Sequence, residues 1–315
     1  MNDFDFLTGH FDVVHRQLTK PLTGSDEWIE YHGTTTGRTH FGGGISIDEM
    51  QFPDQGYRGL SVRLYNPTEQ LWSIYWVDSR DGRITQPPVR GSWSDDGTAD
   101  LTGEREYDGR QVLARYRWSD VTEQTAHWEL AYSIDDGATW ETNWTMDFTR
   151  RADQPPTVEF PKVTGDFDFL VGEWNVHNRR LKSILADADD WFEAPAVTTG
   201  TTYFNGAVST DEIDFTGRGF TGFTLRLFDP VEKKWSIYWV MSTRGVLEPP
   251  VHGGFDHEGV GSFHGPDEHD GRPVDVRFRW TTGEVPVWQQ FFSGDGGRTW
   301  EHNWTMTFTR PEPRS

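Results

Sequence analysis

The chain of 315 residues contains no cysteine, which excludes disulfide bridges, thiolate nucleophiles and cysteine-ligated metals. Basic residues are also few: 29 Lys and Arg stand against 50 Asp and Glu, for a formal net charge of −21. This charge opposes binding to nucleic acid or anionic lipid, because both need cationic side chains. The sequence has no apolar run of membrane-spanning length, and "MNDFDFLTGHFDVV" at the start lacks the features of a signal peptide. We therefore expect a cytoplasmic protein without nucleic-acid or membrane partners.

Hydrophobic residues are also scarce, at 34%, but large aromatic ones are not, with 16 Trp and 21 Phe. Each aromatic side chain buries a large area, so these residues can build a core in spite of the low hydrophobic fraction. The 33 Gly and 17 Pro suit many tight turns between short strands. The composition therefore predicts β-rich globular domains.

The sequence contains an internal duplication in which each copy has the size of a domain. A Pro-rich segment, "RADQPPTVEFPKVTG", separates the copies and is typical of a semi-stiff linker. We predict a first domain at 1–151, a linker at 152–163 and a second domain at 164–315. The clearest matches are "FDFLTGHFDVVHRQL" (4–18) with "FDFLVGEWNVHNRRL" (167–181), "SVRLYNPTEQLWSIYWV" (61–77) with "TLRLFDPVEKKWSIYWV" (224–240), and "TWETNWTMDFTR" (139–150) with "TWEHNWTMTFTR" (299–310).

Each half also carries one Ser-x-Asp-x-Gly-x-Thr-Trp motif, "SIDDGATW" at 133–140 and "SGDGGRTW" at 293–300. The motif is similar to the Asp box of sialidases and other β-propellers. Its Ser and Asp side chains can bond backbone N–H groups in a turn, and its Gly can adopt a positive φ. A propeller needs such a turn in every blade, and one per half is too few. The motif therefore predicts a hairpin turn and no catalytic group.

Almost every other segment alternates in polarity or is rich in β-branched and aromatic residues, which is typical of strands. Turn signals such as "NP" at 66–67 and "DG" at 81–82 separate these segments. We predict an all-β protein of two tandem up-and-down antiparallel β-barrels, with roughly eight to ten strands each by turn spacing. A Greek-key sandwich is the alternative, but it usually needs a long crossing connection, and the sequence shows none.

Each half opens on Phe-x-Phe-Leu-x-Gly-x-Phe/Trp, which places Gly9 before Phe11 and Gly172 before Trp174. This opening is similar to the Gly-x-Trp start of lipocalins and their calycin relatives. In calycins an Arg from the last strand packs over that aromatic ring, and Arg150 or Arg310 ends the last predicted strand of each half here. A guanidinium on an aromatic face would close one end of the barrel by a cation–π contact.

The order "DFLVGEW", "WSIYW", "PP" and the Asp-box-like turn in each half also resembles an uncharacterised bacterial family of the DUF1579 type. Together these resemblances imply a lipocalin-like barrel whose interior holds one hydrophobic or amphipathic molecule. Calycin-like proteins include carotenoid hydratases, pericyclases of natural-product pathways, fatty-acid carriers and haem-binding nitrobindins. The fold therefore does not decide between an enzyme and a binding protein.

Candidate residues come from comparing the two halves. No hydrolase motif occurs, and no metal or cofactor is expected. Polar side chains that could move protons are kept in both halves or are polar in only one of them, and "HWE" would place a His and a Glu on one strand face. The candidate catalytic residues are Glu30, His40, His127, Glu129, Glu193 and Tyr203.

Aromatic and Arg residues repeated in both halves are the candidates for ligand binding. Strand alternation leaves two alternatives open: if the apolar face is the interior, the Arg residues are solvated, and otherwise Arg63 and Arg115 point inward with Glu30. The predicted ligand-binding residues are Trp28, Arg63, Tyr75, Trp76, Arg115, Trp191, Arg226, Tyr238, Trp239 and Arg277.

The leading functional hypothesis is a protein that binds a small hydrophobic or aromatic molecule in a barrel cavity. The alternative is a cofactor-independent cyclase, isomerase or hydratase that acts on a hydrophobic, natural-product-like substrate in the same cavity. We also expect the two barrels to pack on each other, while the sequence leaves open the oligomeric state, the ligand and the barrel that holds the site.

Overall fold

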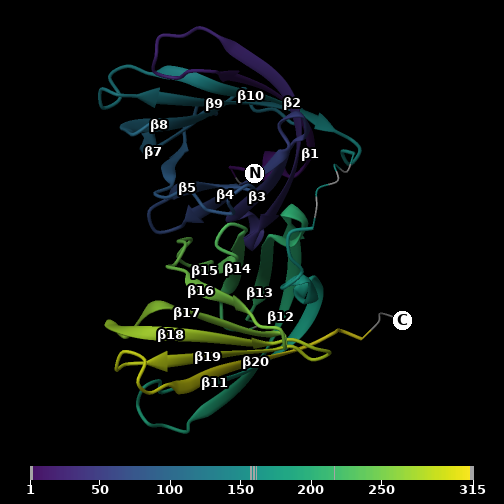
Figure 1. Cartoon of the computed structure of the whole chain (residues 1–315), viewed down its shortest axis with the longest axis vertical. Coiled ribbons are helices and arrows are strands. Elements are labelled where there is room, and N and C mark those ends of the chain that lie inside the picture. Colours follow the sequence, from purple (N-terminus) through teal and green to yellow (C-terminus); the bar gives the residue numbers. More distant parts are fainter. Residues whose placement is uncertain (1–2, 157, 159, 161, 216, 313–315) are drawn as a thin grey trace. The chain divides into compact units, whose positions relative to one another are not determined.

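The computed structural model describes residues 3–156, 158, 160, 162–215 and 217–312. The chain divides into two compact units, Met1–Glu159 and Phe160–Ser315. Each unit contains one closed antiparallel β-barrel of ten strands (Figure 1), which confirms the predicted fold class. Strands that follow one another in sequence are neighbours in the sheet, and the first strand pairs with the last. The barrels are therefore of the up-and-down type, and the Greek-key alternative is wrong.

The N-terminal barrel consists of β1 (Gly9–Leu18), β2 (Trp28–His40), β3 (Ile45–Phe52), β4 (Tyr57–Asn66), β5 (Leu71–Asp78), β6 (Val89–Trp93), β7 (Ala99–Tyr107), β8 (Arg110–Ser119), β9 (Thr125–Ser133) and β10 (Glu141–Arg151). The C-terminal barrel consists of β11 (Gly172–Leu181), β12 (Trp191–Tyr203), β13 (Val208–Asp214), β14 (Thr221–Asp229), β15 (Lys234–Met241), β16 (Val251–Phe255), β17 (Val260–His269), β18 (Arg272–Thr281), β19 (Val287–Ser293) and β20 (Glu301–Thr309). Short 3-10 helices lie at η1 (Asp5–Leu7), η2 (Phe41–Gly43), η3 (Pro53–Gln55), η4 (Asp168–Leu170) and η5 (Phe204–Gly206). Within the described ranges no helix is long and apolar enough to cross a membrane.

The interior of each barrel is its hydrophobic core. Side chains alternate across the sheet, so that Phe11 and Val13 of β1 point inward, as do Ala114, Tyr116 and Trp118 of β8. Large aromatic side chains fill much of this space, which explains how a chain with few hydrophobic residues builds two cores.

A short segment at the start of each unit plugs one end of the barrel. In the N-terminal barrel this plug is residues 4–7, where Phe4 is 1% exposed and its ring lies 4.8 Å from that of Trp72 and 6.0 Å from that of Trp118. A Cβ on Gly37 of β2 would lie 2.1 Å from the Leu7 carbonyl oxygen, so only glycine lets the plug backbone pack this closely. The C-terminal barrel repeats the contact between Gly200 and the segment that contains η4. We call this the plugged end and the opposite one the far end.

An Arg from the last strand fastens the plug in both barrels. The Arg150 guanidinium lies 4.5 Å from the Phe11 ring centroid and donates to the carbonyl oxygens of Phe6 and Thr8 at 2.5 and 2.7 Å. Arg310 lies 3.6 Å from the Trp174 ring centroid and donates to the Val171 carbonyl at 2.9 Å. The expected cation–π closure is present in both copies.

The Asp-box-like motifs form hairpin turns between β9 and β10 and between β19 and β20. The Ser133 hydroxyl donates to Asp135 at 2.7 Å and accepts from the Gly137 N–H at 2.8 Å. The Thr139 hydroxyl donates to the same carboxylate, and hydrogen bonds from Thr139 and Ser133 lower the pKa of Asp135 to about 2. These carboxylates are engaged in shaping the turn, as the sequence indicates.

Candidate functional site

A buried ion pair inside each barrel decides which face of β4 and β14 is interior. Arg63 is 3% exposed, and its guanidinium pairs with Asp48 of β3 while lying 5.3 Å from the Phe4 ring centroid. The Thr35 hydroxyl donates to the same carboxylate at 2.9 Å. Arg226 and Asp211 repeat the pair at 2.5 Å in the C-terminal barrel. Both pairs lie against the plug, so they stabilise the plugged end and stand apart from the far end of the lumen.

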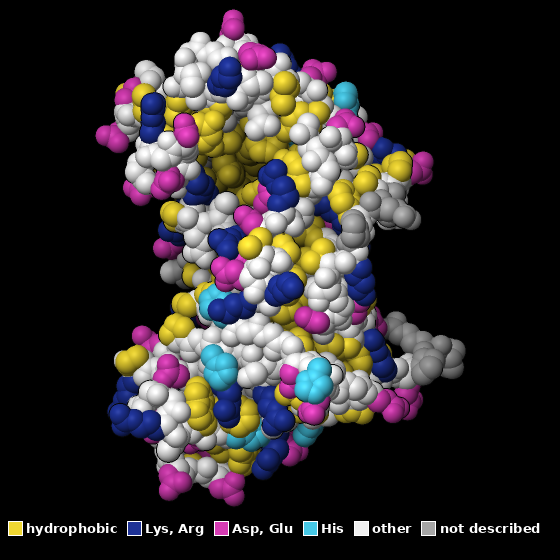
Figure 2. Space-filling view, viewed as in Figure 1, with side chains coloured by type: hydrophobic (Ala, Val, Ile, Leu, Met, Phe, Trp, Pro, Cys, Tyr) yellow, Lys and Arg dark blue, Asp and Glu magenta, His cyan; other side chains and the backbone are white. Residues whose placement is uncertain are grey.

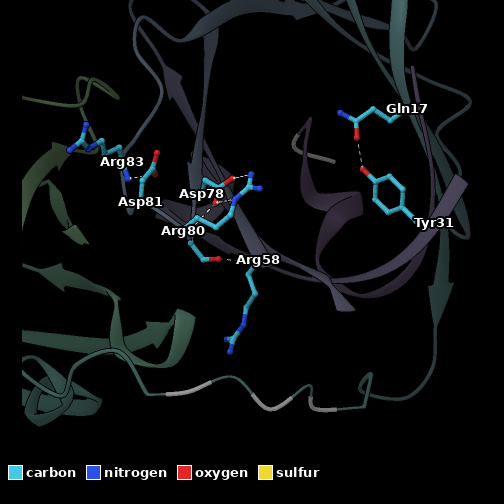
Figure 3. A network of polar contacts seen from close by, with 8 residues as sticks. Gln17, Tyr31, Arg58, Asp78, Arg80, Asp81 and Arg83 are labelled. Atoms are coloured by element: carbon cyan, nitrogen blue, oxygen red, sulfur yellow. Dashed lines mark hydrogen bonds and ion pairs between the residues drawn. The ribbon is translucent and has the colours of Figure 1, made fainter. Parts of the chain in front are cut away.

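An aromatic group that includes a histidine lies nearer the far end of the N-terminal barrel. His15 is fully buried and stacks on Tyr31, with ring centroids 4.8 Å apart and planes 8° apart. The rings of Phe52 and Trp144 lie 5.0 and 5.9 Å from it. The hydroxyl of Tyr31 donates to Gln17 Oε1 at 3.0 Å (Figure 3), which fixes this ring at the wall of the lumen.

The hydrogen bonds of His15 define its protonation. The indole N–H of Trp144 donates to His15 Nδ1 at 3.3 Å, so the neutral ring carries its proton on Nε2. Nε2 has no hydrogen-bond partner in the described ranges of the chain. Burial, with a smaller effect of His32, lowers the pKa of His15 to about 3. His15 is therefore an N–H donor at neutral pH and not a general base.

Replacing His15 by asparagine is expected to flatten the pH dependence of stability on the acid side. The pKa of His15 is about 3 in the folded chain and 6.5 in the unfolded chain. Between these two pH values the unfolded chain binds a proton at His15 and the folded chain does not. The wild type therefore has its full free energy of unfolding above pH 6.5. This free energy falls by on the order of 1 kcal/mol per pH unit as the pH decreases toward 3. Urea unfolding at several pH values between 7.5 and 4.5 measures how the free energy of unfolding depends on pH. His257→Asn, at an exposed histidine, is the control, and an unchanged slope in His15→Asn would contradict the assignment.

A cavity of about 200 Å³ lies at the far end of the N-terminal barrel. Figure 2 shows a hollow in this barrel with hydrophobic side chains around it. The cavity is bounded by residues of four strands and by the β1–β2 loop, and its lining is mostly aromatic or amide. The lining residues are Gln17, Leu18, Thr19, Pro21, Tyr107, Leu130, Tyr132, Asn143 and Trp144.

Arg105 provides a cation beside this cavity. It lies two residues before Tyr107 on the inward row of β7, and its Nη1 donates to the carbonyl oxygens of Glu104, at 2.8 Å, and Pro87. Among the described residues Nη2 is buried without a well-formed hydrogen bond, and the guanidinium also acts on the Tyr116 hydroxyl, where it opposes the rise that burial causes in the pKa of Tyr116. Burial and two neighbouring tyrosines raise the pKa of Tyr132 to about 12, and the nearby Arg105 guanidinium opposes this rise.

The predicted catalytic residues do not come together at the cavity. Glu30 is exposed on the outer face, 4.0 Å from Arg16, and Glu193 is exposed beside His177 at 3.2 Å. His40 and Tyr203 end β2 and β12 at the plugged ends.

His127 and Glu129 do come together, with nitrogen and oxygen atoms 3.5 Å apart, but they face outward from β9. Asp147, which was not predicted, bonds the other ring nitrogen of His127 at 2.6 Å. Among the residues that the structure describes, no group of His, Asp and Glu is arranged to hold a metal ion.

The predicted ligand-binding residues divide between the two faces of the sheets. Arg63, Trp76, Arg226 and Trp239 point inward, and the Trp76 ring covers Gly59, where a Cβ would lie 1.8 Å from it.

The remaining six residues face away from the lumen. Arg115 lies 4.6 Å from the Trp140 ring centroid and Arg277 lies 4.8 Å from that of Trp300. The others are Trp28, Tyr75, Trp191 and Tyr238.

No family model matches the chain. A search of curated proteins found no match either. Among solved structures, the chain is similar to a protein of unknown function from the DUF3598 family of Nostoc punctiforme, with 10% identity, 98% of each chain covered and a TM-score of 0.27. It is also similar to two mutants of transferrin binding protein B from Haemophilus parasuis, each at 8% identity with 96% of this chain covered. The double mutant has 75% of its own chain covered and a TM-score of 0.18. The corresponding values for the single mutant are 76% and 0.19. Similarities at this level carry no argument about function.

His15 and Arg105 are not among the residues predicted from the sequence. One signal for His15 was present: in "HFDVVHRQL" it continues the inward row of Phe11 and Val13, where a polar residue interrupts an apolar alternation. Arg105 lies in "TGEREY", a polar stretch that reads as a solvated strand, so no comparable signal existed.

Proposed function

We propose that the N-terminal barrel binds a small hydrophobic or aromatic molecule at the far end of its lumen. The observation that carries this proposal is the aromatic cavity of about 200 Å³ at the end opposite the plug. One end of the barrel is fastened by Arg150, so a ligand would enter from the other. Pockets for small molecules are typically concave, mostly apolar and furnished with a few polar groups, and this cavity has that composition.

The polar groups indicate what the ligand carries. Tyr107, Tyr132 and Trp144 offer ring faces for stacking. Nη2 of Arg105, which has no well-formed hydrogen bond within the described part of the chain, is a donor beside them, and a buried donor in this state is costly. An oxygen acceptor on the ligand would satisfy it. The proposed ligand is therefore a small aromatic or hydrophobic molecule with at least one acceptor oxygen.

The proposal includes a calycin-like character for both barrels. The Gly-x-Phe/Trp opening, the guanidinium over that aromatic ring and the closed up-and-down barrel support a lipocalin-like or DUF1579-like cup. The enzymatic alternative would use the same cavity. Glu30, His127 and Glu129 face outward, and His15 stays neutral, so the described side chains favour binding over proton transfer.

Filling the cavity tests the assignment. Leu130→Trp adds an indole to the cavity wall and is expected to weaken binding of 2-naphthol at least about tenfold, or about 1.4 kcal/mol, because the ligand loses its space. Calorimetric titration of the full chain measures the affinity. Val14→Trp, which places the same side chain on the outer face of β1, is the matched control and should bind like the wild type.

Two outcomes would contradict the proposal. One is wild-type affinity in Leu130→Trp, and the other is a wild-type chain that does not bind 2-naphthol or related small aromatic alcohols at millimolar concentration. Near-UV circular dichroism verifies that the variants keep their packed aromatic core.

A further inference from the structure

The far end of the C-terminal barrel differs from that of the N-terminal barrel in charge. The inward row of β11 runs through Trp174 and Val176 to Asn178 and Arg180, where β1 has His15 and Gln17 at the last two positions. Gln17 is neutral and accepts a hydrogen bond from Tyr31, whereas Arg180, at the equivalent position of β11, is positively charged. The two copies thus share the barrel fold but differ in the charge of the inward row of their first strand.

No carboxylate in the described part of the chain pairs with Arg180 at this position. Its guanidinium carbon is 4.4 Å from the Trp304 ring centroid, and no ion pair or hydrogen bond joins its side chain to any other residue described in the structure. The charged neighbour is a second cation, Arg218 of the β13–β14 hairpin. Burial and the charge of Arg218 both lower the pKa of Arg180. In a chain with 50 acidic residues, two neighbouring guanidiniums without a carboxylate leave a local positive charge uncompensated.

Arg218 is likewise held by an aromatic ring and not by an acid. Its guanidinium carbon lies 4.2 Å from the Phe192 ring centroid, and within the described part of the chain it forms no ion pair. The side chain is exposed, so an anion from solvent can reach it. Arg180 is half-buried and lies further inside.

A further donor continues the row inward. The indole N–H of Trp304 donates to Asn178 Oδ1 at 3.1 Å, which fixes the amide so that Nδ2 is turned away from Trp304. Asn178 is 3% exposed, and its Nδ2 has no hydrogen-bond partner among the residues that the structure describes. His15 shows the same arrangement in the other barrel, since it also accepts from a Trp and leaves one N–H unpaired.

Aromatic side chains surround these donors. The Trp304 ring, which carries Arg180, lies 5.9 Å from that of Phe215. Phe215 in turn lies 4.9 Å from Phe220 and 6.4 Å from Trp239. A ligand held by the guanidiniums would therefore rest its apolar part against ring faces.

We propose that the far end of the C-terminal barrel binds the carboxylate of a hydrophobic organic acid, with Arg180 and Arg218 as its cationic partners and the aromatic group around Trp304 as its apolar wall. A guanidinium presents two parallel N–H donors that match the two oxygens of a carboxylate. Asn178 adds an N–H donor deeper in the lumen. This site goes beyond the function proposed above, because it lies in the other barrel and selects an acid by charge.

The test compares an acid with its uncharged ester. 2-Naphthoate and methyl 2-naphthoate are titrated into the full chain by calorimetry at low salt. The wild type is expected to bind the acid at least tenfold more tightly than the ester. Arg180→Gln, which installs the residue of the N-terminal barrel, should lose at least tenfold in affinity for the acid and leave affinity for the ester within twofold.

Arg179→Gln is the matched control. Arg179 is the preceding residue on β11, faces outward and lies 4.2 Å from the Trp191 ring centroid, so the variant removes the same charge from the opposite face. It should bind the acid within twofold of the wild type. Arg180→Lys keeps the charge but loses the paired donors and should fall between wild type and Arg180→Gln.

Three results would overturn this inference: no preference for the acid in the wild type, unchanged acid binding in Arg180→Gln, or an equal loss in Arg179→Gln. Leu130→Trp separates this site from the proposed function, because it alters only the N-terminal barrel and should leave the acid preference intact. Thermal unfolding and near-UV circular dichroism identify any variant that fails to fold, in which case Arg218→Gln, at an exposed side chain, replaces it with the same expected direction.

Discussion

Replacing Asp48 by alanine is expected to destabilise the N-terminal barrel by about 3–5 kcal/mol. Asp48 is 1% exposed and is the carboxylate partner of Arg63, which is itself 3% exposed. Without it, the guanidinium would remain buried against Phe4 with its charge uncompensated. The Thr35 hydroxyl would also lose one of its two acceptors and keep only the Glu49 carbonyl oxygen, at 3.1 Å. Urea unfolding followed by tryptophan fluorescence measures the loss.

A double variant separates the contribution of the ion pair to stability from the penalty of leaving one buried charge unpaired. Asp48→Leu with Arg63→Met replaces both charges by apolar groups and should recover most of the stability, because the large penalty comes from leaving one charge unpaired. Asp211→Ala should reproduce the effect in the C-terminal barrel, since Arg226 is equally buried. A loss below about 1 kcal/mol in Asp48→Ala, the range of exposed ion pairs, would show that Arg63 reaches solvent.

Replacing Trp118 by alanine is expected to cost about 3–5 kcal/mol, the range for removing a large buried aromatic side chain. Trp118 is 1% exposed and joins the plug to the barrel wall. Its ring centroid lies 5.4 Å from that of Phe6 and 5.3 Å from that of Phe148. The truncation would leave a cavity beneath the plug. Chemical denaturation of the full chain measures the change.

Trp28→Ala is the matched control for this truncation. Trp28 lies on the outer face of β2, where its ring centroid is 5.9 Å from the Arg16 guanidinium carbon. Its loss should cost about 1 kcal/mol, as expected of an exposed cation–π contact. Equal losses in the two variants would contradict a core that lies inside the barrel.

The sequence predicts the architecture well because strand alternation and turn residues are local patterns, and the duplication is visible by direct comparison of the two halves. It could not predict which face is interior. β4 shows why: Leu60, Val62 and Leu64 face away from the lumen and are as fully buried as Arg63, so alternation there does not separate inside from outside. The two alternatives are each partly right, because Arg63 points inward while Arg115 and Glu30 point outward.

The candidate site was less predictable for a different reason. Arg105 and Arg180 lie in polar stretches, and what distinguishes them is the absence of a carboxylate partner among the described residues, which depends on strands far away in sequence. His127 and Glu129 follow an alternation that suggests a catalytic pair, but only the closed sheet shows that the pair faces outward. Residue spacing along one strand shows neither whether a charged side chain has a partner nor which face of the closed sheet it lies on.

The pairing of β1 with β10, and of β11 with β20, has a consequence for how such a protein arises. Where the first and last strands are neighbours, the two ends of a unit emerge from the same seam. A gene for one barrel can then be copied in tandem without breaking a single backbone pairing. After copying, the pairing of first and last strands holds each unit together by itself, and the side chains that line the two lumens are free to diverge.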